Sequence, residues 1–187
     1  MTEQDFIDAI LAEPDDDVPR LIYADFLEER GNPRSDFIRL QVELATLAPP
    51  PRRNRMYGNP VPQPRDPRDA AHFRRLWERQ MNLLLTHCAE WVEPLIGQAT
   101  GVIFERGCIE GITAQPQAFA TYASLWYQSM PIRQLCIAAP PSMDDWQSFL
   151  ESPSLLNIRT LDLGYAQVDA NLRQKLRSSP YLKNVRI

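Results

Sequence analysis

Few side chains in this sequence have the types and spacing that a reactive site requires. His72 and His87 lie 15 residues apart, with neither an HExxH motif nor a third ligand at a spacing suited to zinc. The acidic run at residues 15–17 lacks the alternating oxygen donors and closing glutamate of a calcium loop. The sequence has no glycine-rich phosphate loop, no GxSxG motif and no Cys/His nucleophile pair. We therefore expect no metal, no cofactor and no enzymatic activity.

The best candidate for binding is an arginine-rich stretch, residues 52–79, which holds eight arginines against three acidic residues. Arginines interleaved with aromatic side chains can hold phosphates and stack on bases. However, residues 1–48 carry 12 acidic and four basic residues, so we favour a clasp onto this acidic part, or an acidic protein partner, over nucleic acid. The candidate residues are Arg52, Arg53, Arg55, Tyr57, Arg65, Arg68, Arg74, Arg75 and Arg79.

A second charged cluster surrounds Gly31. Its members are Asp25, Glu28, Glu29, Arg34 and Arg39, with Arg30 among them. In one interpretation this is a docking cluster in which Asp25 or Glu28 pairs with an arginine and fixes two helices. In another it is a solvated helix face whose ion pairs contribute less than about 1 kcal/mol each. A third and least favoured hypothesis, catalytic carboxylates in a cleft, would require strongly shifted pKa values.

Apolar spacing predicts the elements that carry these residues. Residues 3–13 show the stripe of an amphipathic helix, and a second helix has Pro19 in its first turn and Gly31 just past its end. A third helix begins near Ser35, so residues 1–48 form a small helical module. Residues 49–67, of which seven of 19 are proline, are expected to be a loop or linker. Helical spacing returns over residues 68–94 as one long helix.

The last part of the chain, residues 95–187, repeats a short apolar pattern four times. Its instances begin at Ile109, Ile132, Ile158 and Leu182, with spacings of 23, 26 and 24 residues, the period of leucine-rich-type repeats. Strands are expected near residues 109–114, 132–137, 158–163 and 182–187, with helices near 117–129, 143–151 and 169–177. Residues 102–104 and 108–113 are expected to form a hairpin.

Strands joined by such crossover helices pair in parallel with a right-handed connection. The predicted fold class is therefore α/β, in the broader sense α+β. A small N-terminal helical module is followed by a short leucine-rich-repeat-like solenoid with a parallel sheet.

Composition indicates a protein with a substantial core that we expect in the cytoplasm. Apolar residues make up 44% of the 187 residues, yet no run approaches the roughly 18 apolar residues that span a bilayer. The acidic N-terminus has no apolar signal core. Cys88, Cys108 and Cys136 contain no CxxC pair and are expected to be free thiols in a reducing compartment.

The opening of the chain resembles the bacterial repeat-companion domain. Residues 10–34, ILAEPDDDVPRLIYADFLEERGNPR, carry the resemblance and continue into DFIRLQ at 36–41. The family is an N-terminal module found ahead of leucine-rich-like repeats, and FERGCIEGI at residues 104–112 resembles its segment leading into the first repeat. The chain departs from the family pattern at Phe26 (usually Trp), Asn32 (usually Asp) and Ser35-Asp36 (usually Gly-Glu). This resemblance implies a family and a repeat architecture but no activity.

These patterns predict a non-enzymatic protein–protein interaction module. We expect it to dock through the repeat sheet, its last edge or the arginine-rich loop, as a subunit of a larger bacterial complex. The last predicted strand ends at Ile187 without the polar capping repeat that solenoids usually need, so we expect either that this edge is short enough to be stable in water or that a partner covers it. The alternative is a nucleic-acid-associated accessory subunit that grips phosphates with residues 52–79. Its binding would weaken steeply with salt.

Overall fold

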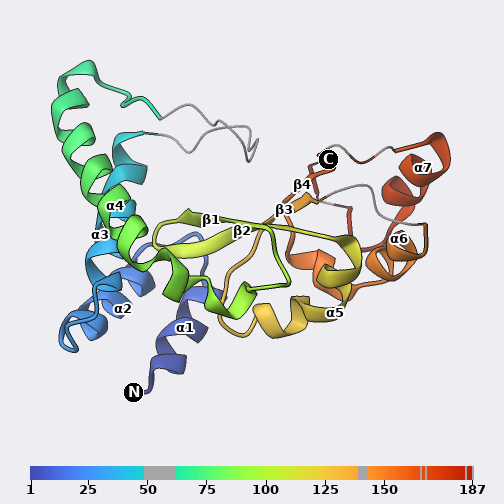
Figure 1. Ribbon diagram of the computed structural model, residues 1–187, viewed down its shortest axis with the longest axis horizontal. Coiled ribbons are helices and arrows are strands. Elements are labelled where there is room, and N and C mark those ends of the chain that lie inside the picture. Colours follow the sequence, from blue (N-terminus) through green and yellow to red (C-terminus); the bar gives the residue numbers. More distant parts are fainter. Residues whose placement is uncertain (49–61, 139–142, 165, 167, 184, 187) are drawn as a thin grey trace. The chain divides into compact units, whose positions relative to one another are not determined.

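The computed structural model describes residues 1–48, 62–138, 143–164, 166, 168–183, 185 and 186 (Figure 1). Within these residues the chain forms seven α-helices and a four-stranded sheet. Contacts divide it into two compact units. The first unit comprises Met1–Glu93 and Phe104–Cys108, and the second comprises Pro94–Ile103 and Ile109–Ile187. The chain therefore has a mixed α/β fold, as the sequence predicts at this coarse level.

The first unit is helical, and its helices begin and end at the signals seen in the sequence. Pro19 lies in the first turn of the second helix, where a missing N–H leaves no hydrogen bond unmade. Gly31, with φ +65°, follows that helix in the left-handed conformation that glycine adopts readily. The helices are α1 (Glu3–Ala12), α2 (Val18–Glu28), α3 (Arg34–Leu47) and α4 (Ala70–Trp91), with a 3₁₀ turn η1 (Pro67–Asp69) before α4. The four helices predicted in this part of the chain are confirmed.

Aromatic and aliphatic side chains from all four helices form the interior of the first unit. Phe6, Tyr23 and Ile38 join α1, α2 and α3 in one buried cluster, because each helix turns its apolar stripe toward its neighbours. Further along α3, Phe37 packs its ring against Trp91 of α4, with centroids 4.7 Å apart, and against Phe104, at 5.3 Å. The hairpin tip therefore belongs to the core of the first unit.

The sheet contains the strands β1 (Gly101–Glu105), β2 (Cys108–Ala114), β3 (Gln134–Ile137) and β4 (Thr160–Asp162), in that spatial order. β1 and β2 form the predicted hairpin, and its turn residues Arg106 and Gly107 both have positive φ, as the tightest hairpin turns require. β2, β3 and β4 pair in parallel, as predicted. Of the fourth predicted strand, residues 182–187, the described residues form one parallel bridge between Thr160 and Arg186; residues 184 and 187 lie outside the described residues.

Helical segments connect the parallel strands. They are α5 (Pro116–Trp126), α6 (Met143–Leu150), η3 (Pro153–Asn157) and α7 (Ala170–Ser178), and η2 (Glu93–Leu95) precedes the sheet. Ile112, Leu135 and Leu161 lie side by side in register across β2, β3 and β4 and are buried. Phe119 of α5 and Phe149 of α6 are fully buried, with ring centroids 5.7 Å apart. In Figure 1, α5 and α6 lie on the same side of the strands. The period-two alternation of the strands thus separates an apolar face from a polar one.

Candidate interaction surfaces

The described part of the arginine-rich stretch lies on η1, the residues before it and the first half of α4. Arg65 is exposed, and its backbone N–H donates to Leu47 O at 2.9 Å. The Arg68 guanidinium donates to the Asp66 carboxylate through two nitrogens, Nε and Nη2, which lie 2.9 Å and 2.6 Å from Oδ2. This pair raises the pKa of Arg68 and lowers that of Asp66. The remaining candidates, Arg52, Arg53, Arg55 and Tyr57, lie outside the described residues.

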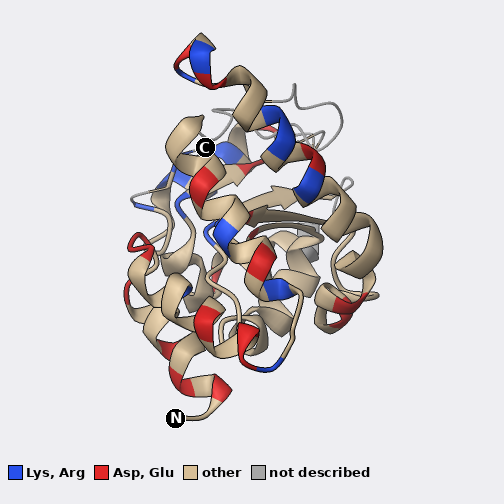
Figure 2. Cartoon of the chain, turned by 90° about the vertical axis from the view of Figure 1, so that its left-hand side faces the viewer, with Lys and Arg blue, Asp and Glu red and all other residues tan. Residues whose placement is uncertain are grey.

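The arginines of α4 differ in their partners. Arg79 Nη2 lies 2.7 Å from Asp36 Oδ2 of α3, so one arginine of the stretch does contact the acidic N-terminal helices. Arg74 and Arg75 are exposed and form no ion pair with the residues the structure describes. Figure 2 shows basic positions along α4 in blue and acidic positions along the helices near the N-terminus in red. These two neighbouring arginines, like Arg65, are therefore cations without an ion pair in the described stretch.

The charged cluster around Gly31 is centred on one arginine. Arg39 Nη2 of α3 lies 2.6 Å from Asp25 Oδ1 and 2.8 Å from Glu28 Oε2, both on α2. The hydrogen bond from Asp25, with a smaller contribution from Glu28, raises the pKa of Arg39. The carboxylates are 70% and 64% exposed, and exposed pairs of this kind contribute at most about 1 kcal/mol. The pairing predicted between the second and third helices exists, but in a solvated setting.

The other members of the cluster lie apart from Arg39. Among the described residues, Glu29 forms an ion pair with its neighbour Arg30, at 3.7 Å, and the Arg30 guanidinium lies over the Phe26 ring, 3.5 Å from its centroid. Arg34 forms no ion pair with a described residue, and its Nε is buried without a hydrogen-bond partner. The structure thus brings together three of the five predicted residues, Asp25, Glu28 and Arg39.

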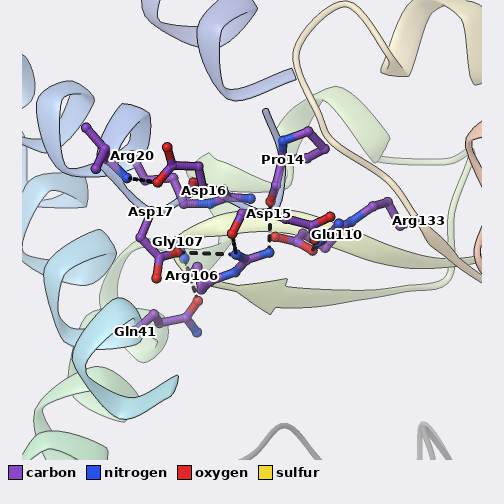
Figure 3. A network of polar contacts seen from close by, with 11 residues as sticks. Pro14, Asp15, Asp16, Asp17, Arg20, Gln41, Arg106, Gly107, Glu110 and Arg133 are labelled. Carbon is purple, nitrogen blue, oxygen red and sulfur yellow. Dashed lines mark hydrogen bonds and ion pairs between the residues drawn. The ribbon is translucent and has the colours of Figure 1, made fainter. Parts of the chain in front are cut away.

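Sequence reasoning missed the polar contacts that hold the hairpin tip within the first unit (Figure 3). The Arg106 guanidinium donates to the carbonyl oxygens of Pro14 and Asp15 at 2.9 and 3.0 Å and lies 3.2 Å from Asp17 Oδ1. It thereby satisfies backbone carbonyls in the turn between α1 and α2, where no helix bonds them. The adjacent Gly107 N–H donates to Gln41 Oε1 of α3 at 2.7 Å. The sequence feature that could have predicted this contact is Gln41 itself, a polar residue inside the apolar stripe of a helix.

Gln41 is buried and uses both ends of its amide. While Oε1 accepts from Gly107, Nε2 donates to Gln80 Oε1 of α4 at 3.1 Å and approaches Phe104 O at 3.4 Å. Gly107 itself has no room for a side chain, since an added Cβ would lie 2.6 Å from Ile38 Cα. The Arg-Gly turn that resembles a family motif therefore has a structural role in this unit.

A second missed contact is a buried ion pair in the second unit. Arg133, just before β3, binds Glu110 of β2 through Nε at 3.2 Å and through Nη2 at 2.5 Å. Glu110 is 1% exposed and the Arg133 side chain 12%. A buried carboxylate needs such a partner, because its transfer out of water is costly. The pair joins adjacent strands and is drawn in Figure 3.

The polar face of the parallel sheet presents side chains in rows. Thr113, Cys136 and Asp162 occupy one row across β2, β3 and β4, and Gln134 and Thr160 lie side by side in the next. Apart from Thr113, which is buried, each of these side chains is half-buried. Burial, and secondarily the negative charge of Asp162, raises the pKa of the Cys136 thiol. We name Gln134, Cys136, Thr160 and Asp162 the sheet face.

Two tyrosine hydroxyls have raised pKa values because they are buried. Burial raises the pKa of Tyr23, helped by the 2.6 Å hydrogen bond that its hydroxyl donates to Glu3 Oε1. Burial alone raises the pKa of Tyr127, whose hydroxyl is buried without a hydrogen-bond partner. Tyr23 shares its buried cluster with Cys108, and packing in the interior explains both shifts.

The remaining candidates for a reactive site are a hollow between two helices and the side chains that could bind a metal ion. A hollow of about 280 Å³ between α6 and α7 is lined by Trp146, Gln147, Leu150, Glu151, Leu172 and Lys175, without the histidine, cysteine or serine that nucleophilic catalysis uses. Among the described residues, no group of three or more His, Cys, Asp or Glu side chains could hold a metal ion. Cys88, Cys108 and Cys136 are free thiols. In the same ranges, no helix has the length and apolar character needed to cross a membrane.

Comparison with known proteins adds no relative. No protein-family model matches the chain, and neither the curated proteins nor the solved structures yield a match. Function must therefore be argued from the surfaces described above.

Proposed function

We propose that this chain is a non-enzymatic protein-binding module that uses its parallel sheet as the docking surface. The observation that carries the proposal is the sheet face. Parallel sheets in α/β proteins are ordinarily covered on both faces, whereas here the face opposite Ile112, Leu135 and Leu161 carries half-exposed polar side chains.

A parallel sheet with one polar, accessible face is typical of solenoid proteins, in which that face binds partners. The alternation of strand and helix along the second unit, at the spacing of leucine-rich-type repeats, supports the same architecture. We accordingly propose a short leucine-rich-repeat-like solenoid for residues 95–187. The N-terminal module is proposed to be a repeat-companion domain, and the whole chain a subunit of a larger bacterial complex in the cytoplasm.

The rows of the sheet face define what a partner would meet. Thr160 offers a hydroxyl, both donor and acceptor, and the neighbouring row carries the thiol of Cys136 and the carboxylate of Asp162. Such a mixed row suits an extended peptide segment or loop more than a polyanion. The free cations at Arg74 and Arg75 supply a separate point of attachment for an acidic partner.

The test is site-specific crosslinking in the native host. A photoreactive residue at Thr160, on the sheet face, is compared with one at Thr121, which is exposed on α5. We expect a discrete protein adduct from position 160 only, and this adduct should survive nuclease treatment and high salt. Equal adducts from both positions, or none from 160, would overturn the proposal.

A matched pair of substitutions gives an independent readout. Thr160→Arg places a long cation on the sheet face, while Thr121→Arg makes the same change on a solvated helix. Copurification of the crosslinked partner should fall about tenfold or more with Thr160→Arg, equivalent to about 1.4 kcal/mol, and stay unchanged with Thr121→Arg. Retention of the partner by Thr160→Arg would exclude the sheet face as the docking surface.

A second candidate function, nucleic-acid binding, is favoured by the exposed and unpaired Arg74 and Arg75. Together with Arg65, they could contact about three phosphates, for which the logarithm of affinity should fall with the logarithm of salt concentration with a slope of about −2 on single strands. Titration of a labelled oligonucleotide with the chain and with an Arg74→Ala/Arg75→Ala variant tests this candidate. A slope near zero, or equal binding by the variant, would exclude it.

A further inference from the structure

We propose that the outward face of α2 is a second docking surface, and that its occupant is a basic amphipathic helix from another protein. This surface is separate from the sheet face and does not rest on the proposed function. Its members follow one side of the helix, at the spacing of i, i+3, i+4, i+7, i+10 and i+11. They are Val18, Leu21, Ile22, Asp25, Glu28 and Glu29, which we name the α2 face.

The first turn of the α2 face is apolar and exposed. Val18, Leu21 and Ile22 are 56%, 37% and 49% exposed, although the opposite side of the same helix is fully packed through Tyr23 and Leu27. Single exposed apolar residues are ordinary, whereas adjacent ones rimmed by polar residues mark interaction sites. Because these three neighbours cover only a small area, we expect a transient contact.

Acidic residues flank this apolar turn on both sides along the chain. Asp15 and Asp16 are exposed before it, and after it the side chains of Asp25, Glu28 and Glu29 are 70%, 64% and 79% exposed. Arg39 and Arg30 offset part of this charge. The carboxylates nevertheless keep most of their surface in water, so they can accept further hydrogen bonds from cations.

Two other exposed apolar pairs among the described residues have a less acidic surrounding. Met81 and Leu85 on α4, which are 38% and 81% exposed, have the single carboxylate of Glu78 among arginines on one side and Glu90 on the other. Tyr122 and Leu125 on α5, 38% and 54% exposed, have only uncharged neighbours on their helix. Of these three apolar patches, the α2 face alone has at least two exposed carboxylates at each end and no arginine run beside them.

The chemistry of the occupant follows from this pattern. An i, i+3, i+4 apolar set forms the ridges that pack against the ridges and grooves of another helix. Lysines or arginines on both sides of the partner's apolar stripe would meet the two acidic groups. This charge complementarity sets orientation and association rate more than affinity. The occupant is therefore a helix with a basic, apolar, basic order along its face.

The probe is a synthetic amphipathic helix of about 18 residues, long enough to form in isolation, with leucines on one side and lysines toward both ends. Its binding to the full chain is followed by fluorescence anisotropy. A charge-reversed peptide with glutamates and a scrambled peptide of the same composition serve as ligand controls. We expect the lysine peptide to bind at least about tenfold more tightly than either control, a difference of about 1.4 kcal/mol, and its affinity to weaken as salt is added.

A pair of matched variants locates the site. Leu21→Ser/Ile22→Ser should reduce binding of the lysine peptide about tenfold, whereas Tyr122→Ser/Leu125→Ser, which removes a similarly exposed pair on α5, should leave it unchanged. Equal loss in both variants, or equal binding of the three peptides, would overturn the proposal. Thr160→Arg should not affect the peptide, so failure here is distinguishable from failure of the sheet-face proposal.

A second copy of the chain is the competing occupant, and it is tested without peptide. Analytical ultracentrifugation over a range of concentrations should show no self-association that depends on Leu21 and Ile22. If the chain does associate and the Leu21→Ser/Ile22→Ser variant does not, the α2 face binds a second copy of the chain and the basic-helix proposal is wrong.

Discussion

The two compact units use the same arginine–carboxylate contact in opposite settings. In the first unit, Arg39 binds Asp25 and Glu28 at 2.6 and 2.8 Å, with carboxylates that are 70% and 64% exposed. In the second, Arg133 binds Glu110, which is 1% exposed. The distances are alike, so exposure decides what each contact does. Water screens the first pair and leaves its charges available to a partner, whereas the second pair is needed to keep a charge out of water.

The largest effect is expected where the buried pair is broken. Arg133→Met should lower the free energy of unfolding of the second unit by about 4 kcal/mol, because the buried Glu110 loses its arginine. Urea denaturation, with hydrogen exchange of β2 and β3 amides to localise the effect, measures it. The double variant Arg133→Met/Glu110→Leu should recover most of the loss. A loss below about 1 kcal/mol would remove the distinction between the two pairs.

Within the second unit, neighbouring residues on β3 should differ because they lie on opposite faces. Leu135→Ala removes a side chain that is 1% exposed and should cost about 3 kcal/mol. Cys136→Ala, on the half-exposed sheet face, should cost less than about 1 kcal/mol. The midpoint of urea unfolding compares the two variants. Similar costs would show that the polar face is packed as tightly as the apolar one.

The first unit has its own buried polar contact at the hairpin tip, which a pair of glycine variants probes. Gly107→Ala should cost about 3 kcal/mol, because positive φ disfavours a side chain and the new Cβ would lie 2.6 Å from Ile38 Cα. Gly31→Ala has a similar φ but nothing within 4 Å of its Cβ, so it should cost only about 1 kcal/mol. Thermal or urea unfolding of both variants provides the measurement. Equal costs would mean that φ alone, and not close packing, explains Gly107.

The smallest effect is expected at the exposed pair. Arg39→Met should change the free energy of unfolding by less than about 1 kcal/mol, since both carboxylates remain hydrated. The same variant should strengthen binding of the lysine peptide to the α2 face, because the cation that competes for Asp25 and Glu28 is gone. Urea unfolding and anisotropy measure the two effects. A loss of several kcal/mol in the free energy of unfolding would show that this exposed pair contributes as much to stability as the buried pair of Arg133 and Glu110.

Local patterns in the sequence predicted most elements of the fold. Helix bounds followed from apolar stripes, from Pro19 and from Gly31, all of which act within a few residues. The alternation of Leu135 and Ile137 around Cys136 predicted both the strand and the inward face. Of the fourth predicted strand, the described residues form a parallel bridge at Arg186.

Prediction of the candidate surfaces was less complete, because charge patterns do not specify partners. Arg74 and Arg79 lie in the same basic run, yet Arg79 meets Asp36 while Arg74 meets no described carboxylate. Arg34 and Arg39 are near neighbours in sequence, but only Arg39 faces Asp25 and Glu28. Which charge is paired depends on how helices pack, and a separation of five residues, about 1.4 turns, places the two arginines of each pair on different sides of the helix.

Spacing, caps and turns within short windows of the sequence were enough to predict the elements and their order. Only the tertiary structure decided which polar residues were structural. Arg106 and Gln41 contact residues at sequence separations of 39 to 92, and no local pattern encodes such a contact. The same packing left Val18, Leu21 and Ile22 exposed beside carboxylates. Whether a helix face is exposed or buried depends on which elements pack against it. That packing sets the cost of burying a charge and the gain of burying a methyl group.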